Sequence, residues 1–258
     1  MKGPKRRDEL LHLIRERGYL SVSGAAAALS VDASTVRRDL ARLDGLGLVQ
    51  RSHGGALPAR DEAEVPYDVK SGRLIPQKQA IAELVATLIP NHASVILDSG
   101  STALTVARAL DDRRGMTVVT PDVRVAAELI FHPDTRVIVP GGESLTGTST
   151  LVSQESLESM RHFHVDIAVV ATDGVDLEGT SNLNGTVVPL KRAMIAAARH
   201  VILVADSSKF GVRKLMKVAP LEEFSEIVTD DGLDQETVQG YPVPIRRAPV
   251  APEGEVLE

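Results

Sequence analysis

The spacing of hydrophobic positions differs between the two ends of the chain. Up to about residue 57, apolar residues recur every three or four positions within short segments, as at Leu10, Leu11 and Ile14. This is the periodicity of amphipathic helices. From residue 77 onward, short runs rich in Val and Ile alternate with helical stretches. The first pattern predicts a small helical domain, and the second predicts an α/β domain whose mainly parallel sheet is covered on both faces.

The N-terminal segments predict three short helices. The first spans residues 6–17, the second follows Ser21 through the letters VSGAAAAL, and the third carries an apolar stripe at Val36, Leu40 and Leu43. Ser21 has the side chain of a helix N-cap. Three helices with a tight turn before the last one are typical of helix-turn-helix domains, whose last helix enters the major groove of DNA.

Polar side chains lie opposite the apolar stripe of the third helix. Hydroxyl and guanidinium groups near its N-terminus suit base edges and phosphates. The letters GLVQRSHGGA that follow predict a short strand and turn, which would form a wing against the DNA backbone. A merely solvated helix face is the alternative, but charge, capping and helix spacing coincide here and favour DNA binding. The predicted DNA-binding residues are Ser34, Thr35, Arg37, Arg38, Arg51 and His53.

The second part of the chain predicts six strands with helices between several of them. The strands are expected at residues 94–98, 116–120, 135–140, 165–171, 200–205 and 227–229, and the helices at residues 102–110, 121–131, 154–161 and 189–199. Ligands of such sheets bind beyond the carboxyl ends of the strands. Five of these strand ends lead into DSGST, TPD, PGGE, ATDGV and DSSKFG, which are rich in glycine, hydroxyl and acidic side chains. They predict a polar ligand crevice.

The loop after the first strand has the composition of a phosphate site. Backbone amides at a helix start attract phosphate, and Ser99, Ser101 and Thr102 add hydroxyl donors. Asp98 and Asp173 are suited instead to accept hydrogen bonds from sugar hydroxyls. A phosphorylated sugar would use both kinds of group.

Several of these side chains have other interpretations. Asp98 alternatively fixes the turn as a capping acid, and Lys209, a candidate cation for phosphate, alternatively is exposed or pairs with Asp206. An isomerase would need a general base near a carbon-bound proton, and Asp98, Asp173 and Glu143 are carboxylates of that kind. A site for turnover and a site for sensing therefore both remain open from these residues alone.

Charge and proline content divide the chain further. Residues 1–60 hold eleven of the 29 Lys and Arg but only six of the 35 Asp and Glu, so a basic head precedes an acidic body. Three prolines and many charges mark a linker between them. The predicted divisions are a winged helix-turn-helix head at 1–57, a linker at 58–76, an α/β domain at 77–235 and a disordered tail at 236–258.

Other classes of protein find little support in the sequence. The chain has no Cys, which excludes disulfides and thiolate metal sites, and His162 and His164 lack the usual metal-ligand spacing. DSGST is not a G-x-G-x-x-G dinucleotide motif. No apolar run approaches the roughly 20 residues that span a bilayer, and LLHLI is too short for a signal peptide. We therefore expect a cytoplasmic protein with no metal, no cofactor and no membrane partner.

The head resembles that of DeoR-type transcriptional regulators. Its letters TVRRDL at residues 35–40, followed by Arg51 and HGGA, match the signature of that family in order. In the body, LDSGST, VPGGE, TDGV, LKRAMIAAARH and ADSSKFG are similar to the DeoR-type sensor domain, and the resemblance covers about residues 6–235. It implies a fold similar to ribose-phosphate and glucosamine-phosphate isomerases. It also implies an effector site lined by Asp98, Ser99, Gly100, Ser101, Thr102, Gly141, Gly142, Asp173, Gly174 and Lys209.

The resemblance implies a repressor and not an enzyme. We expect a multi-domain protein that binds double-stranded operator DNA as a dimer or tetramer and controls genes of carbohydrate metabolism. A phosphorylated sugar or related metabolite would release it. The alternative is a sugar-phosphate-binding protein with residual isomerase activity. Pro121 stands where the family usually has Asn, and Val187 where it often has Glu, so the effector need not be that of any relative.

Overall fold

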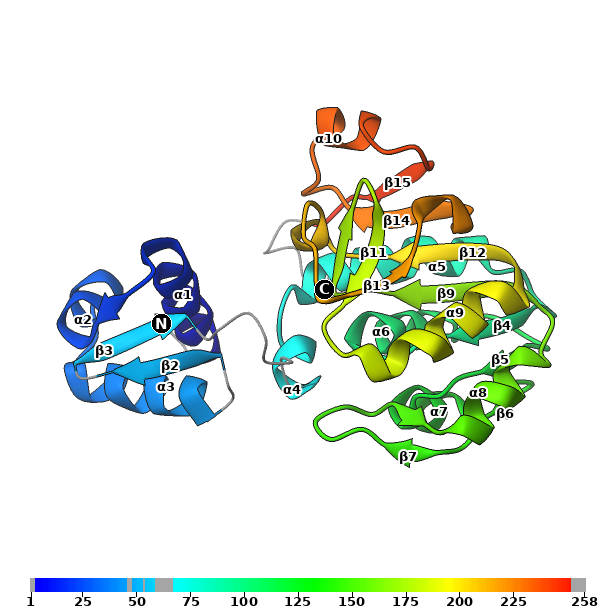
Figure 1. The fold of residues 1–258 in the computed structure, drawn as a ribbon, viewed down its shortest axis with the longest axis horizontal. Coiled ribbons are helices and arrows are strands. Elements are labelled where there is room, and N and C mark those ends of the chain that lie inside the picture. Colours follow the sequence, from blue (N-terminus) through cyan, green and yellow to red (C-terminus); the bar gives the residue numbers. More distant parts are fainter. Residues whose placement is uncertain (1–2, 46–47, 53, 59–66, 252–258) are drawn as a thin grey trace, which may run out of the picture. The chain divides into compact units, whose positions relative to one another are not determined.

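The computed structural model describes residues 3–45, 48–52, 54–58 and 67–251 of the 258-residue chain. These residues divide into two compact units, Met1–Arg73 and Leu74–Glu258 (Figure 1). Residues 59–66 of the predicted linker and residues 252–258 of the predicted tail lie outside the described residues. Within the described ranges, no helix combines the length and the apolar character needed to cross a membrane.

The first unit is a winged helix-turn-helix domain. Its helices are α1 (Gly3–Arg17), α2 (Val22–Leu29) and α3 (Ala33–Gly45), and α4 (Tyr67–Ser71) lies at its C-terminal end. Its antiparallel sheet has the order β1-β3-β2, with β1 (Leu20–Ser21), β2 (Val49–Ser52) and β3 (Gly55–Pro58) (Figure 1). The three helices and the wing expected from the hydrophobic pattern are therefore present.

The core of this unit consists of the predicted apolar stripes. Leu10 and Ile14 of α1 and Leu40 and Leu43 of α3 are fully buried. The Ser21 hydroxyl accepts the Gly24 N–H at 3.0 Å, which confirms the predicted N-cap of α2. Ala25 and Leu29 of α2 join the same core, because each helix turns its apolar side inward and leaves its polar side to solvent.

The second unit is built on a seven-stranded sheet in which all strands are parallel. In spatial order the strands are β15 (Ile245–Ala248), β14 (Glu226–Asp230), β12 (Ala198–Val204), β9 (Val165–Ala171), β4 (Ser94–Leu97), β5 (Thr117–Val119) and β6 (Arg136–Ile138). The predicted fold class is confirmed. Central strands such as β9 are buried along most of their length, as expected for a sheet covered on both faces.

Helices cover both faces of this sheet (Figure 1). On one face, α5 (Ile75–Leu88), α6 (Ser101–Ala109) and α7 (Val123–Leu129) pack in a row. On the other, α8 (Gln154–Arg161) packs against α9 (Val188–Ala197). The strand order reverses between β4 and β9, because chain order proceeds toward β6 on one side and toward β15 on the other. In open α/β sheets, ligands bind beyond the carboxyl ends of the strands at such a reversal.

Two smaller β structures accompany the main sheet. The antiparallel strands β10 (Gly174–Asp176), β11 (Gly179–Asn182) and β13 (Met216–Ala219) form one sheet, and β7 (Glu143–Ser144) pairs with β8 (Leu151–Val152) in another. Three short 3-10 turns lie in the connections: η1 (Gly185–Val187) leads from β11 into α9, whereas η2 (Ser207–Lys209) and η3 (Leu221–Glu223) join successive strands. Neither small sheet was expected from the sequence, because strands of two to four residues carry too few alternations to be distinguished from loops.

The structure corrects the prediction of a disordered tail. Residues 235–248 contain α10 (Gln235–Gln239) and β15, which joins the main sheet as a parallel edge strand. The Asp231 N–H donates to the Ala248 carbonyl at 2.9 Å, and Val243 and Ala248 are buried. Proline-rich composition concealed this strand, yet a proline just before an edge strand removes no ladder hydrogen bond.

Candidate functional site

The exposed face of α3 holds the predicted DNA-contacting residues of this helix. Ser34, Arg37 and Arg38 are exposed and Thr35 is half-buried, whereas Val36 lies in the core. The polar side chains near the N-terminus of α3 therefore face solvent together. Solvent-facing guanidinium and hydroxyl groups at this end of a helix are suited to contact base edges and phosphates.

The wing is tied to the C-terminal end of α3. Arg51 is exposed on β2, and its N–H donates to Asp44 Oδ1 at 3.0 Å. Gly55 begins β3 where a Cβ atom would lie 2.4 Å from the Leu20 carbonyl oxygen, so only glycine fits this close approach. His53, the remaining predicted contact, lies outside the described residues.

A buried carboxylate joins α1 to α3. Asp39 is only 4% exposed, and Arg6 Nε donates to its Oδ2 at 2.6 Å, while Arg7 lies 3.6 Å from its Oδ1. The hydrogen bond to Asp39 raises the pKa of Arg6 above its ordinary value. Asp39 therefore fixes the position of α3 from the core side, a role that the sequence signature alone did not reveal.

The loop after β4 is held by an ion pair at the strand reversal. Asp98 is 1% exposed, and its Oδ1 accepts the Ser99 N–H at 2.7 Å. Its Oδ2 accepts the Ala171 N–H at the end of β9 and a hydrogen bond from Lys191 of α9. Lys191 also donates to the Ala171 carbonyl at 2.9 Å. Asp98 and Lys191 thus fasten β4, β9 and α9 together, and the Asp98 carboxylate serves the protein's own donors.

Lys191 was not among the predicted site residues. It is 4% exposed and lies among buried apolar neighbours on α9. A lysine at a buried position of an amphipathic helix is rare without a paired acid. That mismatch between residue type and position in LKRAM was the available signal.

Asp122 holds the next residue of the same loop. It is fully buried at the N-cap of α7, where its Oδ1 accepts the Arg124 and Val125 N–H groups. Its Oδ2 accepts the Gly100 N–H at 3.0 Å and the Ser149 hydroxyl at 2.7 Å. The amides of residues 99 and 100 are therefore occupied. Sequence reasoning missed this acid, because its second partner, Ser149, is 27 residues away in the chain.

The start of α6 is the part of this loop that can receive an anion. Ser101 and Thr102 are half-buried, and the structure records no hydrogen-bond partner for either N–H group among the described residues. Amides at the first turn of a nine-residue helix point out of the helix and carry partial positive charge. Together with the two hydroxyls they can bind a phosphate.

The loop after β9 carries a second acid. Asp173 Oδ2 accepts hydrogen bonds from Asn182 Nδ2 at 3.0 Å and from the Leu183 N–H at 3.2 Å. Asp173 is half-buried and follows Ala171, whose backbone is bonded to Asp98 and Lys191, by two residues. The adjacent Gly174 is buried, and a Cβ atom there would lie 2.4 Å from the Val212 carbonyl oxygen. Gly174 thus allows close packing.

The remaining predicted residues lie farther along the same sheet edge. Gly141 and Gly142 follow β6, two strands from β4, which corresponds to about 10 Å at the spacing of sheet strands. Both have positive φ, and Gly142 packs against the Val152 backbone of β8. Lys209 ends η2 after β12, and no ion pair joins it to Asp206 within the described part of the chain. The Asp206 side chain instead accepts hydrogen bonds from the Ser208 hydroxyl and N–H.

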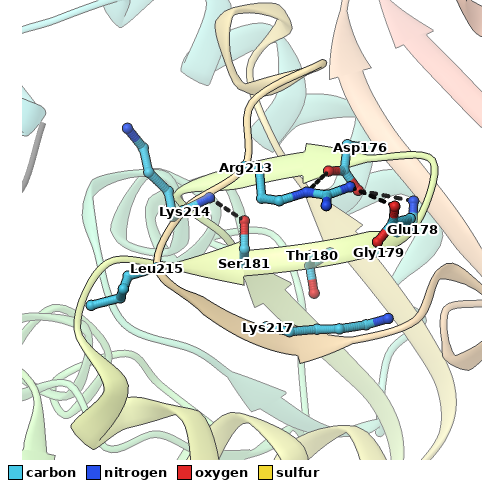
Figure 2. A pocket seen from close by; sticks show the side chains of 9 residues that line it. All are labelled: Asp176, Glu178, Gly179, Thr180, Ser181, Arg213, Lys214, Leu215 and Lys217. Atoms are coloured by element: carbon cyan, nitrogen blue, oxygen red, sulfur yellow. Dashed lines mark hydrogen bonds and ion pairs between the residues drawn. The ribbon is translucent and has the colours of Figure 1, made fainter.

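A separate pocket lies on the small sheet (Figure 2). Arg213 spans two carboxylates there, with its Nε 2.6 Å from Asp176 Oδ2 and its second nitrogen 2.9 Å from Glu178. Burial raises the pKa of the Asp176 carboxyl, but the hydrogen bond and charge of Arg213, together with the backbone N–H groups of Glu178 and Gly179, outweigh burial and leave the pKa below its ordinary value. The charge of Arg213 is balanced by these two carboxylates, which lie in β10 and in the turn before β11. We therefore assign these contacts to stabilising the β10–β11 hairpin and not to binding an anion. Among the described residues, no group of three or more His, Asp or Glu side chains is arranged to hold a metal ion.

Comparison with known proteins identifies relatives of both units. Residues 74–231 match the family described as DeoR C terminal sensor domain, and residues 6–61 match the DeoR-like helix-turn-helix domain. The HTH-type transcriptional repressor CsqR of Escherichia coli (strain K12) is 31% identical over 232 residues, covering 90% of this chain and 89% of that protein. The glycerol-3-phosphate regulon repressor of the same organism is 31% identical over 231 residues, covering 89% and 92%.

Solved structures share parts of the fold at low sequence identity. Ribose 5 phosphate isomerase A from Neisseria gonorrhoeae is 17% identical, with a TM-score of 0.40 over 54% of each chain. The Pyrococcus horikoshii OT3 translation initiation factor eIF-2B is 19% identical, with a TM-score of 0.45 over 87% of this chain and 86% of that chain.

Proposed function

The chain belongs to the DeoR family of transcriptional regulators, and from this premise we propose that it is a repressor of carbohydrate metabolism genes whose operator affinity falls when a phosphorylated sugar binds. One observation carries the proposal. The same chain has an arginine-bearing α3 on a winged helix-turn-helix unit and a phosphate-suited helix start at the strand reversal of an α/β unit. A DNA-binding part joined to a small-anion site is the minimum that a metabolite-controlled repressor needs.

Operator DNA is bound by α3 and the wing in this proposal. Ser34 and Thr35 lie in the first turn of α3 and reach base edges, while Arg37 and Arg38 contact bases or phosphates. Arg51 on the wing contacts the backbone and positions the head. We place the protein in the cytoplasm, because operator DNA and phosphorylated metabolites meet there.

The effector is held between the loops after β4 and β9. Its phosphate accepts hydrogen bonds from the amides and hydroxyls of Ser101 and Thr102, and its hydroxyl groups approach Asp173. One relative is a glycerol-3-phosphate regulon repressor, which supports a small phosphate ester as the class of ligand. Lys209, Gly141 and Gly142 follow β12 and β6 at the carboxyl ends of the strands, where a larger ligand would reach them.

We propose that two or four copies act together. One helix-turn-helix head reads one half-site, so paired heads related by two-fold symmetry match a repeated operator. The effector then changes operator affinity by favouring an arrangement of the heads that fits the DNA less well.

We propose further that the ligand is bound without turnover. The Asp98 carboxylate, at the end of β4, accepts three hydrogen bonds from the protein itself and is 1% exposed, so it is poorly placed to remove a substrate proton. Incubation with ribose 5-phosphate or glucosamine 6-phosphate, followed by analysis of isomers, tests this. Turnover that Asp98→Asn abolishes would favour the enzyme alternative.

The proposed function is tested with the DNA upstream of the protein's own gene. Gel-shift titration should give a specific complex, and a panel of sugar phosphates should contain at least one compound that dissociates it. Inorganic phosphate and the unphosphorylated sugars serve as controls, because the proposal requires both halves of the ligand. Specific binding that no phosphate ester weakens would contradict the sensor assignment.

A further inference from the structure

The side chain of Asn182 has a buried oxygen without a partner. Asn182 ends β11 and is 7% exposed. Its Nδ2 donates to Asp173 Oδ2 at 3.0 Å, but its Oδ1 has no hydrogen-bond partner in the described part of the chain. A buried polar atom left unpaired costs free energy, so it persists where something outside the protein satisfies it.

The orientation of this amide is fixed by its neighbour. A carboxylate accepts hydrogen bonds but cannot donate them, so the NH₂ group of Asn182 has to face Asp173. The Leu183 N–H donates to the same carboxylate oxygen at 3.2 Å and keeps the acid in place. A flipped amide would set Oδ1 against the negative charge. The unpartnered atom is therefore an acceptor.

The acceptor lies at the strand reversal and not in a remote part of the core. Asp173 follows Ala171 by two residues, and the Ala171 backbone is held by Asp98 and Lys191. The Thr172 hydroxyl also donates to the Ser181 carbonyl at 3.0 Å, so the end of β11 that carries Asn182 lies against the residues that follow β9. In the proposed function the phosphate sits on the start of α6, which follows β4, the strand next to β9 in the sheet.

We propose that Asn182 determines effector specificity by requiring a hydrogen-bond donor on the carbon chain of the ligand. The inference rests on the proposed function, since it concerns the same crevice. Asn182 Oδ1 and the Asp173 carboxylate both accept, so a hydroxyl or ammonium group binds there. A carboxylate or a carbon without a donor leaves the acceptor unpaired, and the carboxylate is also repelled by Asp173. Sites built around a buried hydrogen bond discriminate strongly against ligands that lack it.

Matched pairs of phosphate esters test this on the full-length protein. Glycerol 3-phosphate and 3-phosphoglycerate differ in one terminal group, hydroxymethyl against carboxylate. Glucosamine 6-phosphate and 2-deoxyglucose 6-phosphate differ in an ammonium group, and ribose 5-phosphate and 2-deoxyribose 5-phosphate differ in a hydroxyl. Calorimetry and operator release should show that at least one donor-bearing compound binds, and that it binds at least about tenfold more tightly than its partner.

Variants at position 182 assign the discrimination to this side chain. Asn182→Leu should reduce the preference within the pair to less than about threefold and leave operator binding unchanged. Asn182→Thr retains an acceptor oxygen and should keep part of the preference, which also guards against loss of folding in the Leu variant. Asn91→Leu is the control, because Asn91 precedes the amino end of β4, away from the carboxyl ends of the strands. This variant should keep the full preference.

The possible failures are distinct. Full discrimination in folded Asn182→Leu, or equal binding of donor-bearing and carboxylate ligands by the unaltered protein, overturns the role of Asn182 alone. Absence of binding by every ester and by inorganic phosphate overturns the proposed function, and the role of Asn182 with it.

Discussion

At the scale of single residues, a buried ion pair joins helix α9 to the central strands of the main sheet. Lys191 and Asp98 lie 93 residues apart in sequence and are 4% and 1% exposed. Removing one member of such a pair leaves an uncompensated buried charge, whereas removing both charges does not. The ion pair therefore holds β4, β9 and α9 together mainly because breaking it would leave a buried charge unpaired. It need not make the folded protein more stable than an apolar pair would.

We expect Lys191→Met to lower the free energy of unfolding by about 3–5 kcal/mol, because the Asp98 carboxylate would be left buried and unpaired. Urea denaturation measures this. The double variant Lys191→Met with Asp98→Asn should be more stable than Lys191→Met alone, since the amide carries no charge and its single oxygen still accepts one of the two backbone hydrogen bonds. An additive double variant would show that the two side chains do not interact.

On α3, Arg37→Ala or Arg38→Ala should weaken operator binding by about 1–3 kcal/mol if the side chain reads a guanine. A phosphate contact would give a smaller loss, with a lower dependence of affinity on salt. Gel-shift titration at two salt concentrations separates these results. Arg108→Ala, an exposed arginine of α6, is the control. Unchanged affinity in both α3 variants would contradict the assigned recognition face.

At the start of α6, Ser101→Ala combined with Thr102→Ala should leave operator affinity intact and raise the effector concentration needed for release by at least about tenfold. The reason is that hydrogen bonds to a charged group contribute about 1.5–3 kcal/mol each. Thr105→Val is the control, because that hydroxyl donates to the Ser101 carbonyl inside the helix. Release at an unchanged concentration would move the phosphate site elsewhere.

At the scale of elements, the edge of the main sheet is held by one buried acid. Glu226 of β14 is 6% exposed, and it accepts a hydrogen bond from His200 of β12 at 2.8 Å and another from Arg246 of β15. Burial raises the pKa of Glu226, but the hydrogen bonds and charge interactions with Arg246 and His200 together outweigh burial. The pKa of Glu226 therefore lies below its ordinary value of 4.5.

A carboxyl whose pKa is lower in the folded protein stabilises the fold above its unfolded-state pKa and loses that contribution as pH falls through the folded-state value. The unaltered protein should thus lose stability more steeply than Glu226→Gln as pH falls from about 5 to 3. Urea denaturation across this range gives both curves, and their difference removes the effect of other acids such as Asp166. Parallel curves would contradict the assignment.

The elements also show what the sequence pattern can and cannot predict. Residues 165–171 form the strand expected there, because a run of buried β-branched residues has few other uses. β15 was missed because prolines and arginines dominate its local composition, and its pairing with β14 is a tertiary fact. In the crevice, the loop after β4 was predicted from its letters, but Lys191, Asp122 and Asn182 were not. Their roles depend on partners brought close only by the fold.

At the scale of the whole molecule, two ligands have to influence each other through one equilibrium. If the effector weakens operator binding by a given factor, the operator has to weaken effector binding by the same factor. Calorimetric titration of the effector, with and without saturating operator DNA, should reproduce the ratio of operator affinities from gel shifts. For Arg37→Ala, which should bind operator DNA poorly, the same DNA concentration should change the effector affinity little. An effector affinity indifferent to operator DNA would contradict the release mechanism.

The position of β15 has a consequence for how the molecule is made. All seven strands pair in parallel, so each pairing waits for a distant segment, and such topologies form slowly. β15 is the last of the seven in chain order, and until it leaves the ribosome β14 presents an open edge. The head, built from short-range contacts, is complete long before that. The nascent chain therefore acquires its recognition helix before its complete sensor sheet, and the unpaired edge of β14 is open to aggregation in the interval between them.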